Sequence, residues 1–216
     1  MIKSIFSPFL NFFVVRVVAP DVNYILIHPK EDQNPFKFSW EPLLTQEIHN
    51  ACHSGNEGVV FFDVGGAFGI FSKYVSLLNS KAEIISFEPY WLRRYTMRLN
   101  TIFCGRIKLS KKFIAGETQG QNITLQDAAT EFGVIPTLIK MDIEGAEYDV
   151  IMGSLSFLQK TKPLILLEFH ENIMKRAGLK PENIIHSLRA IGYSDEKLEH
   201  HGVSSGNYLI KFTYGN

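Results

Sequence analysis

The sequence contains few cysteines and no pattern that would join them. Its 216 residues include two cysteines, Cys52 and Cys104, which are far apart and form no CxxC pair. A small fold held together by disulfides is therefore excluded, and so is a zinc site built from closely spaced thiols. Such sparse cysteine usage is typical of a reducing compartment, and we predict a cytoplasmic location.

The sequence also lacks an excess of charge of either sign. Lysine and arginine together number 22, aspartate and glutamate together number 22, and the formal net charge is zero. Proteins that bind the phosphate backbone of nucleic acids usually carry a basic excess. We therefore expect no nucleic-acid partner, and an acidic partner is not indicated either.

No apolar run is long enough to span a membrane. The most apolar stretch lies at the N-terminus, where Lys3, Pro8, Asn11 and Arg16 interrupt it, whereas a membrane-spanning helix needs about 20 mainly apolar residues. No small-residue cleavage site precedes Pro20, so a secretory signal is not indicated. A strand or packed arm is the favoured interpretation, and membrane contact through this arm is the alternative.

A regular alternation of strands and helices is present from residue 59 onward. Continuous apolar strands alternating with helices are typical of a mainly parallel sheet that is covered on both faces. The sequence therefore predicts an α/β fold with a doubly wound sheet. The expected strands are Val59–Val64, Glu83–Phe87, Ile107–Ala115, Thr137–Met141, Pro163–Phe169, Tyr193–Leu198 and Asn207–Tyr214, and the expected helices are Ile70–Leu78, Trp91–Asn100, Leu125–Phe132, Glu147–Leu158 and Pro181–Ala190.

An N-terminal arm precedes this alternating part. Phe12–Val18 and Tyr24–His28 are β-rich and flank a Pro-Asp turn, which predicts a β-hairpin. Helical spacing follows over Glu41–His53. We predict that residues 1–55 form an arm that packs on a core made of residues 56–216.

The first predicted strand of the core ends in a glycine-rich turn. Asp63 is followed by Gly65, Gly66 and Gly69, and glycines let a ligand approach the main chain closely. The helix that follows offers unpaired N–H groups to a carboxylate or a phosphate. The dinucleotide fingerprint G-x-G-x-x-G is absent, and Asp63 would repel a pyrophosphate. A ligand that carries an ammonium group beside its carboxylate suits this turn better, and an ordinary tight turn is the alternative.

An acidic residue follows the next predicted strand. Glu88 lies one strand–helix unit after the glycine turn, near the spacing at which a carboxylate binds the two hydroxyls of a ribose. Glutamates that follow strands are common, so Glu88 alone is weak evidence for a site. It becomes informative because the glycine turn lies one strand–helix unit before it. Together the two features indicate a nucleoside site.

Further acidic residues and a histidine follow the later strands. Lys140, Asp142 and Glu144 alternate with a period of two and would project to one side if the extended backbone continued that far. His170 ends the next strand, so Asp142, Glu144 and His170 are expected to converge. Such a group suits a general base or a divalent metal. Salt bridges and helix N-caps are the alternative.

These segments resemble the FkbM-type methyltransferases, a branch of the S-adenosylmethionine-dependent class I enzymes. The matching stretches span residues 59–171 and include VVFFDVGGAFGIFS, ISFEPYWLRRYTMRLN, ITLQD, LIKMDIEGAEYDVIMGS and KPLILLEFHE. The resemblance implies a seven-stranded Rossmann-like sheet with an antiparallel C-terminal hairpin. It also implies that residues 56–216 bind S-adenosylmethionine and methylate a hydroxyl of a sugar or small natural product.

The resemblance also implies roles for single residues. Asp63, Gly65 and Gly69 would line the methionine end of the cofactor, together with Gly66, and Glu88 would bind the ribose hydroxyls. Asp142 would lie close to the sulfonium and beside the acceptor. His170 is the preferred base, with Asp142 orienting it or holding a cation; Asp142, Glu144 and His170 are the candidate ligands for Mg²⁺. The family usually has Ala-Asn where this chain has Gly66-Ala67.

Two other classes of protein stay open at this point. The altered Gly66-Ala67 pair is compatible with a binding protein that has kept the fold without catalysis. A nicotinamide-dependent oxidoreductase shares the architecture but is disfavoured by the missing glycine fingerprint.

One further histidine pair lies in the N-terminal arm. His49 and His53 are one helical turn apart, with Cys52 beside them. No second group of ligands is visible nearby in the sequence, so a solvated helix face is favoured over a zinc site.

Overall fold

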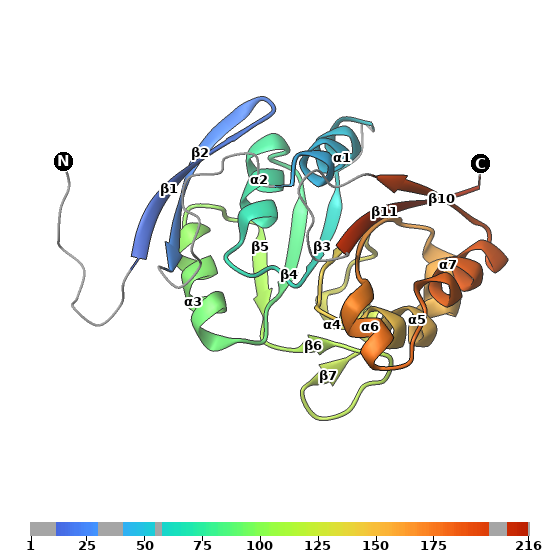
Figure 1. The fold of residues 1–216 in the computed structure, drawn as a ribbon. Helices are drawn as coiled ribbons and strands as arrows, with labels where there is room; N and C mark the ends of the chain where they lie inside the picture. Colours follow the sequence, from blue (N-terminus) through green and yellow to red (C-terminus); the bar gives the residue numbers. More distant parts are fainter. Residues whose placement is uncertain (1–11, 30–40, 55–57, 199–206, 216) are drawn as a thin grey trace.

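The computed structural model describes residues 12–29, 41–54, 58–198 and 207–215 (Figure 1). Residues 1–11, on which the membrane-contact alternative largely depends, lie outside the described residues. None of the helices in the described ranges is long and apolar enough to cross a membrane.

A seven-stranded sheet forms the centre of the molecule. Its strands lie in the order β10-β11-β9-β8-β3-β4-β5. The five strands from β9 to β5 are parallel, whereas β11 is antiparallel to both of its neighbours, β9 and β10. This confirms the predicted doubly wound, Rossmann-like α/β fold with an antiparallel C-terminal hairpin. The strands are β3 Val60–Val64, β4 Glu83–Phe87, β5 Ile107–Ser110, β8 Leu138–Met141, β9 Leu164–His170, β10 Tyr193–Leu198 and β11 Asn207–Tyr214.

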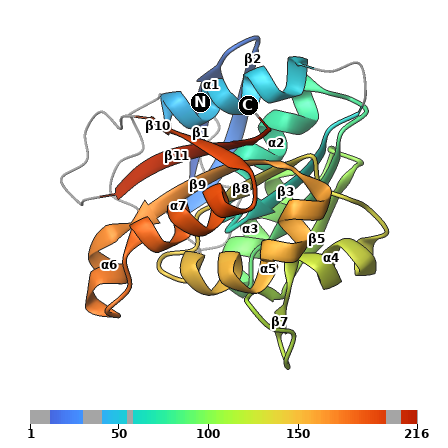
Figure 2. The ribbon, with the colours of Figure 1, turned by 90° about the vertical axis from the view of Figure 1, so that its right-hand side faces the viewer.

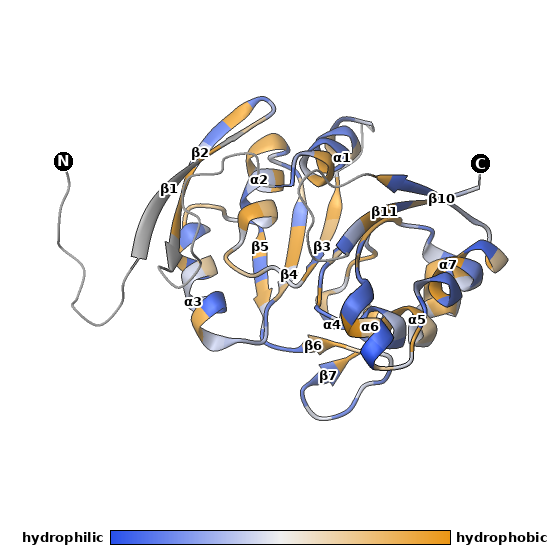
Figure 3. Cartoon of the chain, in the orientation of Figure 1, coloured by the Kyte–Doolittle hydropathy of each residue, from blue (hydrophilic) through white to orange (hydrophobic). Residues whose placement is uncertain are grey.

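Helices cover both faces of the sheet. One buried cluster joins the sheet to α4, α5, α6 and α7, and Figure 2 shows α5 and α7 side by side on this face. A second cluster joins the opposite face to α1, α2 and the N-terminal hairpin. Hydrophobic residues are concentrated on the central strands and on α2 (Figure 3). The helices are α1 Pro42–His53, α2 Ile70–Leu78, α3 Trp91–Asn100, α4 Leu125–Phe132, α5 Glu147–Thr161, α6 Glu171–Arg176 and α7 Pro181–Ala190.

The N-terminal hairpin packs against the core. β1 Phe12–Ala19 pairs with β2 Val22–Pro29 in antiparallel register, as the sequence predicts. The Tyr24 hydroxyl donates to the Ile70 carbonyl at 3.1 Å. Asn100 of α3 exchanges two hydrogen bonds with the backbone of Ile27, at 2.6 and 3.0 Å, in the way that a neighbouring strand would. The division into an arm and a core at residue 55 stays a prediction, because residues 55–57 lie outside the described ranges.

Two local predictions need correction. The predicted strand Ile107–Ala115 is divided: β5 ends at Ser110, and β6 Phe113–Ile114 pairs with β7 Asn122–Ile123 in a separate small sheet. The division occurs because the Ser110 hydroxyl accepts the Lys112 N–H at 3.2 Å, which turns the backbone. The sequence pattern also does not predict the short helix α6, which begins directly after β9.

The strand order reverses between β3 and β8. From β3 the chain proceeds outward through β4 to β5, then returns to β8 on the other side of β3 and continues to β9. In open α/β sheets ligands bind outside the carboxyl ends of the strands at such a reversal. The residues that follow β3, β4 and β8 are therefore the ones to inspect for a site.

Candidate functional site

A cavity of about 350 Å³ lies at the carboxyl ends of β3, β4 and β8. This volume is in the range of small-molecule sites. Of the residues predicted to form the site, five line the cavity and three do not. Those in the lining are Gly65, Gly66, Glu88, Asp142 and Glu144, and those outside it are Asp63, Gly69 and His170.

Neighbouring atoms leave no room for side chains at two positions of the glycine turn. Gly65 has a φ of 79°, and a Cβ added there would overlap the carbonyl oxygen of Asp142. A Cβ on Gly66 would overlap the Ser86 hydroxyl on the adjacent strand β4. Ser86 therefore explains why glycine stands where the family usually has alanine. Gly69, with a φ of 82°, precedes the first residue of α2 and does not line the cavity.

Ala67 completes the turn in a left-handed conformation, with a φ of 45°. This conformation is costly for alanine and easier for asparagine, the residue that the family usually carries here. The turn keeps it because the Ala67 N–H donates to Glu88 Oε2 at 3.0 Å.

Asp63 lies beneath the turn and is buried away from the cavity. Its Oδ2 accepts from Ser72 at 2.6 Å and from Ser86 at 3.5 Å. Its Oδ1 has no hydrogen-bond partner among the described residues, but lies 3.7 Å from the Lys140 ammonium. Asp63 therefore holds α2, β4 and β8 together under the turn, and the cavity wall conceals it from a ligand.

Lys140 carries a buried positive charge at the centre of the site. Its Nζ donates to the Gly65 carbonyl at 2.8 Å and lies 3.6 Å from Asp142 Oδ2. Burial by itself lowers the pKa of Lys140, but the carboxylates of Asp142 and Asp63 outweigh burial and the pKa is raised. The ammonium is therefore charged, and it fixes the glycine turn against the end of β8.

Glu88 is buried at the edge of the cavity. Its Oε1 accepts the Tyr90 N–H at 2.9 Å, while its Oε2 accepts from Ala67. Burial raises the pKa of Glu88, and these two N–H groups together with Arg93 oppose the rise. An ionised carboxylate offers about four lone-pair positions, so two positions stay available for hydroxyl donors from a ligand.

His170 lies behind Asp142 and forms a buried pair with Glu147. His170 Nδ1 is 2.8 Å from Glu147 Oε1, and His170 Nε2 is 3.5 Å from Asp142 Oδ1. Nδ1 donates to the Glu147 carboxylate in this contact, and Nε2 faces Asp142. Burial lowers the pKa of His170, but the hydrogen bond to Glu147 and the nearby carboxylates outweigh it and raise the pKa.

Glu144 does not join this group. The strand ends at Met141, and Glu144 has a φ of 54°, so the extended backbone needed to align it with Asp142 does not persist. Its carboxylate is exposed and lies 4.0 Å from Arg93. Asp142 and Glu144 both line the cavity and His170 lies outside its lining, so the three side chains share no common point of convergence among the described residues.

The donor set at this site does not fit a divalent cation. The Glu144 carboxylate lies 4.0 Å from Arg93, and the Lys140 ammonium already lies 3.6 Å from Asp142. Within the described ranges, Asp142, Glu144 and His170 do not form a group whose ligand atoms converge on one point. The predicted Mg²⁺ site is not supported.

Sequence patterns assign no role to several residues of the site. Glu147 is the last residue of the DIEGAE stretch, but the sequence pattern gives it no role beyond the start of the helix α5. Ser72 and Ser86 hold Asp63 in place, but isolated serines give no sequence signal. The cavity lining also includes Glu41, Tyr90, Arg93, Lys112 and Phe113.

Residues 103–194 match the family model described as the methyltransferase FkbM domain. The matched range contains Asp142, Glu147 and His170, whereas the glycine turn and Glu88 precede it. The search of curated proteins found no match for the chain.

Solved methyltransferase structures share the fold. Methyltransferase FkbM from Methylobacillus flagellatus KT aligns with a TM-score of 0.57 and 20% identity, over 72% of this chain and 43% of that chain. The N-methyltransferase NodS from Bradyrhizobium japonicum WM9, in complex with S-adenosyl-L-homocysteine, gives 0.58 and 13%, over 87% and 91%. A SAM-dependent methyltransferase from Agrobacterium tumefaciens gives 0.62 and 11%, over 93% and 70%.

This chain thus spans less than half of the Methylobacillus protein, and at these identities the alignments establish the fold. The family match adds a likeness in sequence to the likeness in fold. It covers residues 142–147 and the strand that ends at His170. Residues 103–194 are therefore similar to the FkbM methyltransferase domain, and the chain has the fold of these solved methyltransferases.

Proposed function

We propose that this protein binds S-adenosylmethionine in the cavity and methylates a hydroxyl group of a sugar or small natural product. The observation that carries the proposal is that Glu88, Asp142 and the glycine turn line one cavity. The NodS complex with S-adenosyl-L-homocysteine supports the choice of cofactor, since the two folds correspond.

The residues present fit the cofactor. Glu88 binds the two ribose hydroxyls with the lone pairs that Ala67 and Tyr90 leave free. Gly65 and Gly66 line the cavity, and their missing Cβ atoms let the turn lie close to the Asp142 carbonyl and the Ser86 hydroxyl. The main chain of the turn therefore forms a wall against which the methionine part would lie. When bound, S-adenosylmethionine supplies the electrophilic methyl group.

Asp142 and His170 then act on the acceptor. Methylation of a hydroxyl forms an O–CH₃ bond, breaks the S–CH₃ bond and releases the hydroxyl proton. Asp142 faces the cavity and accepts a hydrogen bond from that hydroxyl, which orients its oxygen for attack. His170 Nε2, 3.5 Å behind Asp142, receives the proton through this carboxylate, while Glu147 holds the imidazole. Positioning supplies most of the acceleration, and the base adds roughly 10²–10⁴-fold.

The rim of the cavity suits a small acceptor with an apolar face. Tyr90 and Phe113 are exposed there, with their rings 6.2 Å apart in an edge-to-face arrangement. Arg93 lies 5.5 Å from the Tyr90 ring centre. Aromatic faces beside a cation offer contacts to a ring that also carries polar substituents, which is the character of a sugar or a hydroxylated natural product.

A methyl-transfer assay tests the proposal. The protein is incubated with S-adenosylmethionine and a panel of monosaccharides, glycosides and hydroxylated natural products, and products are identified by mass spectrometry. We expect a methyl ether, and Asp142→Asn should lower kcat by about 10²–10⁴-fold. Glu182→Gln, an exposed carboxylate on α7, serves as the control with unchanged kcat.

Other results would point to other functions. Methylation of an amine in place of a hydroxyl would overturn the choice of acceptor group. Calorimetry with S-adenosylmethionine and NAD separates the remaining classes: binding of NAD alone would indicate an oxidoreductase, and binding of neither would indicate a protein that uses this fold without the cofactor.

A further inference from the structure

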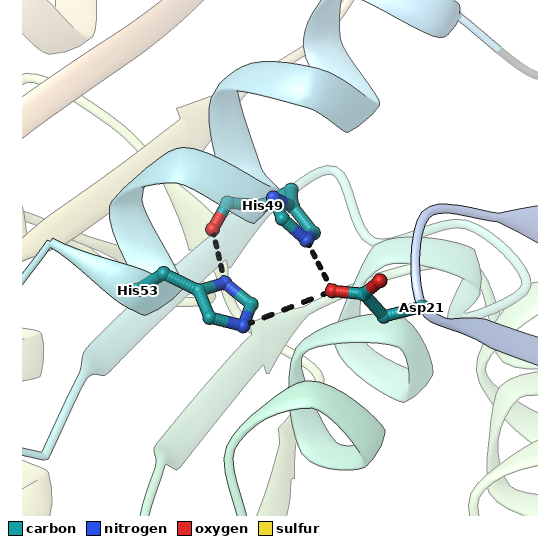
Figure 4. Close-up of side chains that lie close together, drawn as sticks. All are labelled: Asp21, His49 and His53. Carbon is teal, nitrogen blue, oxygen red and sulfur yellow. Dashed lines mark hydrogen bonds and ion pairs between the residues drawn. The ribbon is translucent and has the colours of Figure 1, made fainter.

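A histidine pair and an aspartate meet on the face of the molecule opposite α5 and α7. Asp21 lies in the turn between β1 and β2, and His49 and His53 lie one turn apart on α1. Figure 4 shows the three side chains pointing toward one another. One ligand atom from each lies within 4.8 Å of the others. The aspartate carries no sequence signal, because it comes from a separate element that the hairpin brings beside α1.

The nearby sulfur does not belong to this group. Cys52 lies on the same helix, but its side chain is buried in the core beneath α1. Burial raises the pKa of Cys52 to about 11, so that it stays a thiol, which is a poor ligand. The available donors are therefore two imidazoles and one carboxylate.

The hydrogen bonds fix which imidazole nitrogen faces the centre of the group. His53 Nδ1 lies 2.9 Å from the His49 carbonyl oxygen. Because a carbonyl can only accept, Nδ1 carries the proton in this bond, and Nε2 of the neutral ring presents a lone pair. That Nε2 lies 4.0 Å from Asp21 Oδ2. A lone pair and a carboxylate oxygen face each other favourably only with a proton or a cation between them.

A hydrogen bond of this kind is also how metal-binding histidines are oriented. In such sites the second ring nitrogen usually donates to a backbone carbonyl or a carboxylate, which sets the tautomer and aims the ligand nitrogen. The contact between His53 Nδ1 and the His49 carbonyl has this form. His49 supplies the second imidazole, with Nε2 at 2.8 Å from Asp21 Oδ2.

The spacing suits a tetrahedral ion. With bonds of about 2.0–2.1 Å, two ligand atoms of a tetrahedral zinc lie roughly 3.3 Å apart. The two contacts to Asp21 Oδ2, at 2.8 and 4.0 Å, lie on either side of this value, so small side-chain movements would equalise them. Two imidazoles favour a transition metal over Mg²⁺ or Ca²⁺. Three protein ligands at a partly exposed position leave the fourth place to water.

We propose that Asp21, His49 and His53 bind a divalent transition metal of the zinc type, which links the N-terminal hairpin to α1. The backbone conformation and one hydrogen bond of the hairpin turn support this role. Asp21 has a φ of 63°, a conformation that aspartate tolerates better than most residues. Tyr74 holds the preceding residue by donating to the Pro20 carbonyl at 3.2 Å. The site is independent of the methyl-transfer cavity and of the proposed function.

Titration with Zn²⁺ tests the site, using the full chain treated with a chelator and then freed of it. Calorimetry should give one site per chain, and Co²⁺ should give the intense visible absorption of a four-coordinate ion. His53→Ala and Asp21→Asn should each raise the Kd for Zn²⁺ at least about tenfold. Both variants should fold, because the His53 side chain is half-exposed and asparagine tolerates the left-handed backbone of the hairpin turn as aspartate does.

The matched control is His186→Ala, which removes one exposed histidine from α7 and should leave the Kd unchanged. His200 and His201 lie outside the described residues and could bind metal as a pair, so all variants are repeated with both replaced by alanine. Among chains with both histidines replaced, a Kd for Zn²⁺ that is the same with and without His53→Ala or Asp21→Asn would overturn the proposal. Absence of any Zn²⁺ binding would also overturn it.

A second measurement reports on the link between the two elements. Because an ion that binds only the folded state stabilises it, Zn²⁺ should slow hydrogen exchange of the amides in β1 and β2. The slowing should disappear in His53→Ala, although His53 is not part of the hairpin. Slowing of exchange that persists in His53→Ala would contradict a bridge from Asp21 to α1.

Discussion

Replacing Glu88 tests the connection between the glycine turn and the strand beside it. In the folded chain Glu88 accepts one N–H from Ala67 and one from Tyr90, at 3.0 and 2.9 Å, and its side chain is buried. Glu88→Ala leaves both N–H groups without an acceptor, at about 1–3 kcal/mol each. Removal of a buried carboxylate, whose pKa burial raises, offsets part of this cost. We expect a loss of about 2–4 kcal/mol in the free energy of unfolding without any ligand.

Glu88→Gln tests the loss of one of the two hydrogen bonds from the Ala67 and Tyr90 N–H groups. An amide keeps one carbonyl oxygen as acceptor, whereas its NH₂ group would face the second N–H, so the expected loss is about 1–3 kcal/mol. Urea unfolding of the cofactor-free variants measures these values. Glu83→Ala, at the start of the strand β4 that Glu88 follows, removes a half-exposed side chain 4.0 Å from Lys108 and should change stability by less than about 0.5 kcal/mol. If Glu88→Ala and Glu83→Ala had the same free energy of unfolding, the stabilising role of the Glu88 hydrogen bonds would be refuted.

Three further changes test the turn and the buried pair. Gly65→Ala should lower the free energy of unfolding by about 3 kcal/mol or more, because its Cβ would overlap the Asp142 carbonyl at a positive φ; a loss below about 1 kcal/mol in urea unfolding would contradict this. Ala67→Asn should raise it by about 0.5–1 kcal/mol, since asparagine tolerates the left-handed conformation, and an unchanged value would speak against strain at this position. His170 has a raised pKa, so its contribution to stability is complete below the unfolded value of 6.5 and is lost as the pH rises through the folded pKa. Unfolding at a series of pH values should show this decline in the original chain and not in His170→Gln, and parallel curves would count against the pairing with Glu147.

The sequence predicts the fold well because the strands of a parallel sheet carry a strong local signal. The strands β3, β4 and β9 are mainly apolar and mostly buried, and glycine or proline lies close to each of them. The division of Ile107–Ala115 escapes prediction because it depends on one serine hydroxyl that binds a backbone N–H two residues later.

The sequence predicts the site only in part. A motif indicates which residues lie near the strand ends, but not which side of the backbone each occupies. Asp63 and His170 belong to the site as buried supports and do not line the cavity. The period of two that predicts the position of Glu144 fails once the backbone becomes left-handed. Asp21 joins the two histidines of α1 only through the packing of the hairpin, which no local pattern specifies.

The most direct test of the proposed function is a crystal structure with S-adenosyl-L-homocysteine at a saturating concentration. The arrangement of Glu88 and Asp142 predicts the nucleoside in the cavity, with both ribose hydroxyls donating to Glu88 while its bonds to the Ala67 and Tyr90 N–H groups persist. A nucleoside bound elsewhere, or a cavity that stays empty, would contradict it.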